Sequence, residues 1–102
     1  MEKTIVLPAP IVTITVVKGK IVCNPWKLEV KRGTKVKFDY ADPFAVHFGG
    51  KTPFPHVSFN GSGSIVTEPI PSDMPYGVYR YFVAVYDGTR VLTEDPDIII
   101  VP

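Results

Sequence analysis

The sequence predicts an all-β fold, a Greek-key β-sandwich of about eight strands. Two observations support this prediction. Eleven prolines are spread along the 102 residues and leave few windows long enough for a helix. Between them, apolar and polar residues often alternate with a period of two, and β-branched residues are frequent. Residues 1–102 are expected to form a single domain, because a chain of this length can bury one modest core.

The first half of the chain contains four predicted strands, at residues 11–17, 27–31, 34–40 and 44–48. The second and third flank Gly33, which tolerates the positive φ that a tight turn needs. We therefore predict that Leu28–Tyr40 forms a β-hairpin. Ala41-Asp42-Pro43 is expected to end it, because proline interrupts strand pairing.

The second half of the chain is predicted to contain the remaining strands. Residues 49–63 include four glycines and two prolines, so only a brief strand is expected there, at residues 57–59. Longer strands are predicted at residues 64–68, 78–86, 89–93 and 98–101. In the longest of these, alternation places one set of side chains in the core: Tyr79, Tyr81, Val83 and Val85.

Charge and cysteine content exclude several classes of protein. A formal net charge of +1 gives no field that would attract nucleic acid, so no nucleic-acid partner is expected. The single cysteine, Cys23, cannot form an intrachain disulfide. No signal peptide and no membrane span are predicted, because the apolar runs are too short. The compartment stays open, either cytoplasmic or that of a mature secreted form.

Two segments resemble the cupredoxin family. In Lys20–Phe38, an Asn-Pro step precedes the pattern Leu-x-Val-x-x-Gly-x-x-Val-x-Phe, as in the early strands of that family. Gly77–Tyr81 resembles its strand leading to the copper-binding cysteine, so the resemblance covers residues 11–48 and 77–102. It implies that His47 lies close to the first copper histidine. Val83, however, stands where the cysteine would be, and a blue-copper centre requires that thiolate. We therefore expect no cofactor.

A second resemblance is to immunoglobulin-like and fibronectin type III domains. Asp73–Tyr79 is similar to the approach to their tyrosine corner. That resemblance implies that the Tyr79 hydroxyl bonds to the backbone a few residues upstream, with Tyr81 in place of the usual second cysteine. On either resemblance Trp26 would be a core residue.

The loop Lys51–Gly61 is the predicted binding surface, with Phe54, His56 and Phe59 as its candidate residues. The two phenylalanines are costly to expose unless a partner covers them. The alternative is that both rings tuck under the loop and cap the end of the sandwich.

A metal site is the alternative function. His47, His56, Cys23 and Met74 have donor atoms suited to Cu(I) or Zn(II), although no two of them lie at motif-like spacing. No enzymatic activity is expected, because the sequence lacks a nucleophile motif, a paired-carboxylate motif and a phosphate-binding glycine loop. Cys23 is expected to pack as a small hydrophobic residue.

These observations predict a non-catalytic, copper-free module for protein interaction or assembly. The C-terminal segment Ile98–Val101 is apolar on both faces, whereas a strand with one wet face would alternate. The segment is therefore either covered within the fold or paired with a second copy. We predict a homodimer through this terminal strand.

Overall fold

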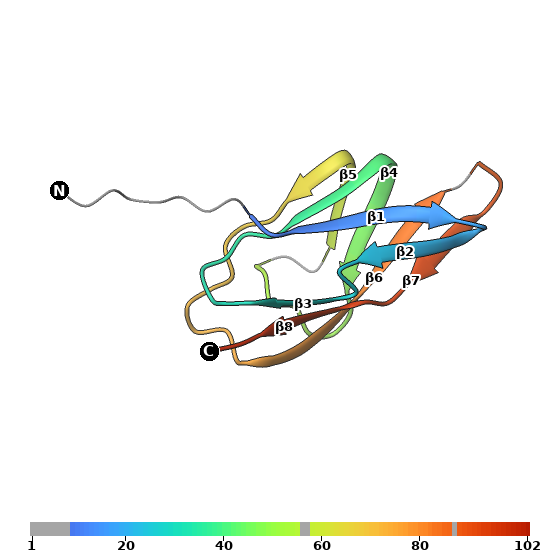
Figure 1. Ribbon diagram of the computed structural model, residues 1–102. Coiled ribbons are helices and arrows are strands. Elements are labelled where there is room, and N and C mark those ends of the chain that lie inside the picture. Colours follow the sequence, from blue (N-terminus) through green and yellow to red (C-terminus); the bar gives the residue numbers. More distant parts are fainter. Residues whose placement is uncertain (1–8, 56–57, 87) are drawn as a thin grey trace.

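The computed structural model describes residues 9–55, 58–86 and 88–102, which contain eight β-strands and no helix (Figure 1). The strands are β1 (Ile11–Val17), β2 (Lys20–Asn24), β3 (Lys27–Val30), β4 (Lys37–Phe48), β5 (Ser58–Val66), β6 (Gly77–Tyr86), β7 (Val91–Glu94) and β8 (Asp97–Ile100). The prediction of an all-β fold is confirmed. Within the described ranges, nothing forms a helix long and apolar enough to cross a membrane.

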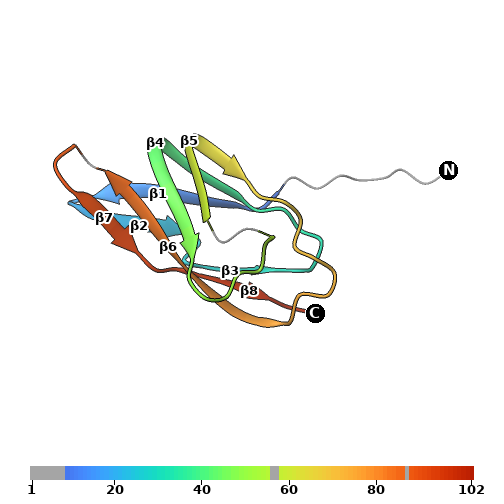
Figure 2. The ribbon, with the colours of Figure 1, turned by 180° about the vertical axis from the view of Figure 1, so that it is seen from behind.

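The strands follow one path around the core, in the order β2-β1-β4-β6-β8-β3, with β5 added to β4 and β7 to β6. Two long strands, β4 and β6, each pair with different neighbours along their length. β4 pairs with β1 through its first residues and with β6 through its last ones. β6 in turn pairs with β4 at Tyr81–Val85 and with β8 at Gly77–Arg80. The sheet therefore wraps around the core nearly to closure, as the two opposite views show (Figures 1 and 2).

The predicted hairpin Leu28–Tyr40 is wrong. β3 pairs with β8 and the start of β4 pairs with β1, both in parallel. Residues 31–36 therefore cross from the β3–β8 side of the core to the β1–β4 side. Gly33 has φ +82, and its N–H donates to the carbonyl of Ile70. The N–H of Ile70 donates in turn to the carbonyl of Thr34. The turn is thus held by the loop before β6, a contact that local sequence does not reveal.

β4 and β5 are both longer than predicted. β4 continues through Ala41-Asp42-Pro43 because a bulge shifts its register with β5 there, and bulges accommodate proline within a strand. β5 continues through Gly61 and Gly63. Gly63 has φ +89, and a Cβ atom at Gly61 would come within 2.5 Å of the Ile65 side chain. β5 bends sharply near its middle (Figure 1), and the glycines permit this bend instead of ending the strand.

The core is built from the inward residues of the strands. Tyr79, Tyr81, Val83 and Val85 are all buried, as predicted for β6. Trp26 is 39% exposed, so the expectation of a core tryptophan is wrong. It lies in the short connection between β2 and β3, outside both strands.

β8 lies inside the sheet and not at its edge. It pairs with β6 on one side and with β3 on the other over Asp97–Ile100, and Ile98 and Ile100 are buried. The apolar character of Ile98–Val101 therefore reflects burial within the fold. Edge-to-edge pairing of two copies through this strand is not available, because both of its edges are occupied.

The tyrosine corner is present. The Tyr79 hydroxyl donates a hydrogen bond to the carbonyl of Pro75 at 2.7 Å. Arg32 fixes the same loop, since its Nε donates to the carbonyl of Met74 at 2.8 Å and its Nη1 to the Tyr76 hydroxyl at 3.0 Å. These bonds attach the loop before β6 to the crossing segment after β3.

Replacing Tyr79 with phenylalanine removes the corner bond and keeps the buried ring. We expect the free energy of unfolding, measured in urea, to fall by about 1 kcal/mol, because a partly buried hydrogen bond is lost. Tyr76→Phe is the matched control. Its ring is 51% exposed, so it should cost less than about 0.5 kcal/mol. Equal losses in the two variants would show that the corner bond contributes nothing specific.

Candidate functional site

The predicted binding loop turns its aromatic rings inward. Phe54 is 2% exposed, and its ring contacts those of Phe48 and Phe59 edge-on, at centroid distances of 5.6 and 5.7 Å. Phe59 is half-buried against the core. This is the capping arrangement that the sequence left as an alternative, so the ring of Phe54 is not open to a partner. The third candidate, His56, lies outside the described residues.

The predicted metal ligands within the described residues do not come together. Cys23 points inward from β2, whereas His47 is exposed on the outer side of β4, so the sheet separates them. Met74 packs against the core from the loop before β6. No three His, Cys, Asp or Glu residues of the described ranges lie close enough to hold a metal ion. The geometry therefore gives the alternative metal site no support.

Cys23 is not activated as a nucleophile. Burial, and to a smaller extent the nearby Glu94 carboxylate, raises the pKa of its thiol to about 11. A reactive cysteine needs the opposite, a lowered pKa and access to solvent. Its neighbour in the core is Tyr81, whose hydroxyl is buried without a hydrogen-bond partner in the described part of the chain. Burial, with smaller contributions from Cys23 and Asp97, raises the pKa of Tyr81 well above its usual range.

The outer side of the sheet formed by β4, β6 and β7 has an unusual composition. Where these three strands lie side by side, their outward residues include no Lys, Arg, Asp or Glu, and we call this part of the surface the uncharged face. It consists of Pro43, Ala45, His47, Phe82, Ala84, Tyr86, Val91 and Thr93. Strand register joins them into one surface, because His47 pairs with Phe82, Ala45 with Ala84, Ala84 with Thr93 and Tyr86 with Val91. Figure 2 looks toward these strands.

Large apolar side chains project from the uncharged face. Phe82 is 48% exposed, Tyr86 59% and Val91 66%. An antiparallel strand with one side in water normally carries polar residues on that side. The next outward residue on β6, Arg80, is paired with Asp97 at 3.2 Å and with Asp95 at 3.9 Å. The apolar centre of the face therefore lies next to a charged residue, Arg80, that is already paired with two carboxylates.

The two alanines make the face concave. A hollow of about 340 Å³ lies over Ala45 and Ala84, with Pro43, Tyr86, Val91 and the neighbouring Asn60 among its walls. A second hollow of about 520 Å³, between Val16 of β1 and Tyr40 of β4, also has Pro43 and Tyr86 in its lining. The Tyr86 hydroxyl donates to the carbonyl of Gly88 at 2.9 Å, which fixes its ring between the two hollows.

Sequence reasoning missed this surface. The inward residues of β6 were identified, but its outward residues Val78, Phe82, Ala84 and Tyr86 are apolar as well. The signal was the same one that drew attention to Ile98–Val101, namely a strand that is apolar on both faces. The outward residues of β8 are buried or partly buried by the fold, whereas Phe82 and Tyr86, which point outward from β6, are exposed to solvent.

Comparison with known proteins does not place the chain in a family. No protein-family model matches it, and no curated protein matches it in sequence. What the domain does has to be inferred from the chemistry of its own surface.

Proposed function

We propose that this domain is a non-catalytic protein-interaction module and that the uncharged face binds its partner. The observation behind this proposal is that Tyr86 and Val91 are exposed on paired strands, and that Phe82 is exposed on the same side of β6, beyond Ala84, on a surface without formal charge. The cores of protein interfaces are depleted of charged residues and enriched in tyrosine and phenylalanine. Large aromatic side chains at such positions supply most of the binding energy.

A protein suits this surface better than a small molecule does. Small-molecule sites enclose most of their ligand, whereas the hollow over Ala45 and Ala84 lies on the outside of a sheet. A protein loop could place one apolar side chain in this hollow and cover Phe82 and Tyr86 with its surroundings. Partners without a strong charge are favoured, because the face offers no formal charge to pair with.

The pairing pattern supports a cupredoxin-like architecture over an immunoglobulin-like one. Immunoglobulin sheets are antiparallel, whereas here β1 pairs in parallel with β4, and β3 with β8.

The proposal that the domain is non-catalytic is supported by Cys23, whose raised pKa keeps the thiol protonated at neutral pH. Val83, at the position where the resemblance would require a copper-binding cysteine, is fully buried in the core.

Photo-crosslinking from two positions tests where a partner binds. A photoreactive amino acid at Thr93, on the uncharged face, should capture a protein that the same group at Thr15, exposed on β1, does not. The captured protein is then purified and its affinity measured by calorimetry. Phe82→Asp should weaken binding at least about 30-fold, because truncating an interface hot spot costs about 2 kcal/mol or more.

Ile11→Asp is the matched control for that measurement. Ile11 is 44% exposed at the start of β1, where it pairs with Lys37 at the opposite end of β4 from His47, so its substitution should leave the affinity within about threefold of wild type. Equal losses in the two variants, or equal capture from Thr93 and Thr15, would overturn the proposed location.

A further inference from the structure

β5 presents the longest free strand edge within the described residues. It pairs with β4 and with no other strand. In Figure 2 it lies at the margin of the sheet, beside β4. A free edge exposes a row of backbone N–H and C=O groups that another strand can pair with.

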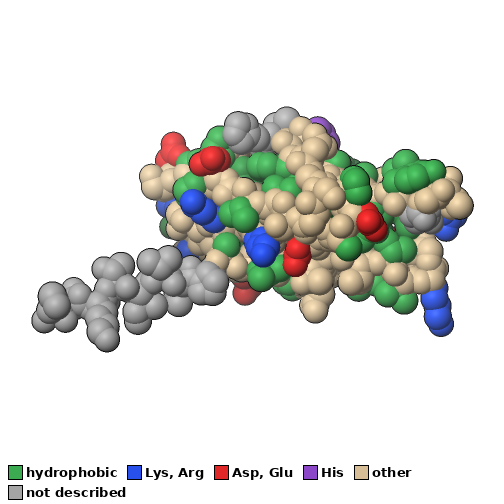
Figure 3. Space-filling view, turned by 90° about the horizontal axis from the view of Figure 1, so that it is seen from above, with side chains coloured by type: hydrophobic (Ala, Val, Ile, Leu, Met, Phe, Trp, Pro, Cys, Tyr) green, Lys and Arg blue, Asp and Glu red, His purple; other side chains and the backbone are tan. Residues whose placement is uncertain are grey.

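β5 lacks the features that usually protect such an edge. The other edge strands are short and carry charges: Lys20 on β2, Lys27 and Glu29 on β3, and Glu94 on β7. β5 has nine residues, Ser58–Val66, none of them charged and none of them proline. Charges and prolines are the common devices against edge pairing. The view from above the β4–β5 side shows neutral side chains and backbone between scattered charged residues (Figure 3).

The bend in β5 does not prevent a further strand from pairing. β4 already pairs with β5 on both sides of this bend, from Lys37 to His47, with Ala41 and Asp42 bulged out of the pairing at the bend. A strand with a matching bend could follow the opposite edge on both sides of it. A second β5 has that bend.

The sequence of β5 is nearly symmetric about Ser62. Glycines flank this residue, Asn60 and Ser64 come next, and Phe59 and Ile65 follow. Antiparallel pairing of two copies about Ser62 would place residues of the same kind opposite one another: Ser62 and Ser62, Gly61 and Gly63, Asn60 and Ser64, Phe59 and Ile65. Exposed residues would face exposed ones and half-buried residues half-buried ones, so each face of the sheet continues across the junction.

We propose that two copies of this chain associate through their β5 strands, antiparallel and centred on Ser62. A two-fold interface requires a self-complementary surface, and the symmetry of β5 provides one. No like charges meet across this register. Since β4 lies next to β5, the dimer would also place two uncharged faces on one continuous sheet, a consequence that rests on the function proposed above.

Charge swapping at Ser62 tests both the association and its register. Wild type should show a dimer mass by sedimentation equilibrium between micromolar and millimolar concentrations. Ser62 is exposed, and like charges directly opposite one another on neighbouring strands are destabilising. Ser62→Lys and Ser62→Asp should each weaken the dimer at least tenfold, while an equal mixture of the two should restore it. Thr15→Lys on β1 is the control and should leave the dimer intact.

Disulfide trapping gives an independent readout. Directly opposed residues of antiparallel strands have Cα atoms about 4.5 to 5.5 Å apart, within the range that a disulfide spans. Ser62→Cys should therefore form a covalent dimer under mild oxidation, whereas Val22→Cys should not. Urea denaturation of each variant ensures that loss of the dimer is not loss of folding.

Three results would overturn the proposal: a monomeric wild type throughout the concentration range, mixed Ser62 variants that stay monomeric, or equal crosslinking of both cysteine variants. Phe82→Asp separates this proposal from the function proposed above. It should weaken partner binding at least about 30-fold and leave the β5 dimer unchanged.

Discussion

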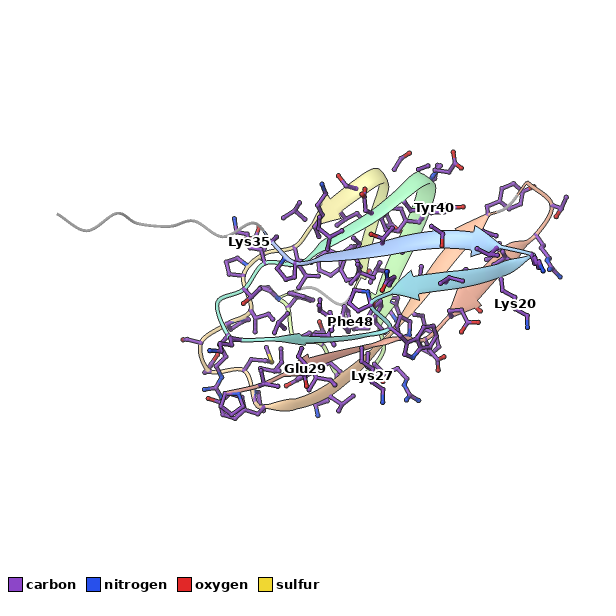
Figure 4. The ribbon with its side chains drawn as sticks, in the orientation of Figure 1. Lys20, Lys27, Glu29, Lys35, Tyr40 and Phe48 are labelled. Atoms are coloured by element: carbon purple, nitrogen blue, oxygen red, sulfur yellow. The ribbon has the colours of Figure 1, made fainter. Side chains whose placement is uncertain are left out.

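Phe48→Ala should lower the free energy of unfolding by about 3 to 5 kcal/mol. Phe48 is fully buried at the end of β4, and its ring contacts Tyr81 at a centroid distance of 5.3 Å and Phe54 at 5.6 Å (Figure 4). Tyr81 in turn contacts Phe38 at 5.4 Å. Phe48 thus joins the capping loop to the aromatic centre of the core. Domains of this size have a total stability of about 5 to 15 kcal/mol, so the loss is measurable by urea denaturation and could unfold the protein on mild heating.

Phe82→Ala is the matched control for Phe48→Ala. Phe82 pairs with His47, the residue before Phe48, but its ring points to solvent on the uncharged face. Its loss should cost less than about 1 kcal/mol. A double-mutant cycle between Phe48 and Phe54 should show a coupling of about 0.5 to 1.5 kcal/mol, as expected for an edge-on aromatic pair. A control variant as unstable as Phe48→Ala would contradict the assignment of Phe48 to the core.

Local pattern was sufficient to predict most strands and their inward residues, because alternation depends only on neighbouring positions. β6 illustrates this, with Tyr79, Tyr81, Val83 and Val85 all buried as predicted. Which strands pair was not predictable in the same way. The residues around Gly33 have the composition of a hairpin turn, yet the bonds with Ile70 hold them as a crossing segment. Pairing depends on partners distant in sequence, which local propensity does not encode.

The candidate site was less predictable than the fold. The loop containing Phe54 was the predicted binding surface, with burial of its rings as the open alternative, and the structure buries the Phe54 ring next to Phe48. The exposed aromatics are on β6 instead, at Phe82 and Tyr86. Sequence alone could mark β6 and β8 as apolar on both faces. It could not decide which of the two strands has its outward residues covered by the fold, because that depends on the neighbours beside which each strand packs.

Two buried acids should make the fold sensitive to alkaline pH. The Cys23 thiol has an ordinary pKa of 9.0, which the folded state raises to about 11. Tyr81 is shifted in the same direction from an ordinary value of 10.0, first by burial and then by Cys23 and Asp97. Between pH 9 and pH 11 the folded protein therefore keeps protons that the unfolded chain has released. Stability falls with rising pH wherever the folded state binds more protons.

The free energy of unfolding should therefore be fully retained below pH 9 and should fall by roughly 2 to 3 kcal/mol by pH 11 through Cys23 alone. Urea denaturation under reducing conditions at pH 8 and pH 10.5 measures this loss. Cys23→Ala should be less stable than wild type at pH 8, because it leaves a small cavity, and should lose less stability at pH 10.5. Tyr81→Phe should be at least as stable as wild type at pH 8, because the hydroxyl it removes has no partner within the described residues. Parallel pH profiles for wild type and Cys23→Ala would show that the buried thiol does not cause the alkaline loss of stability.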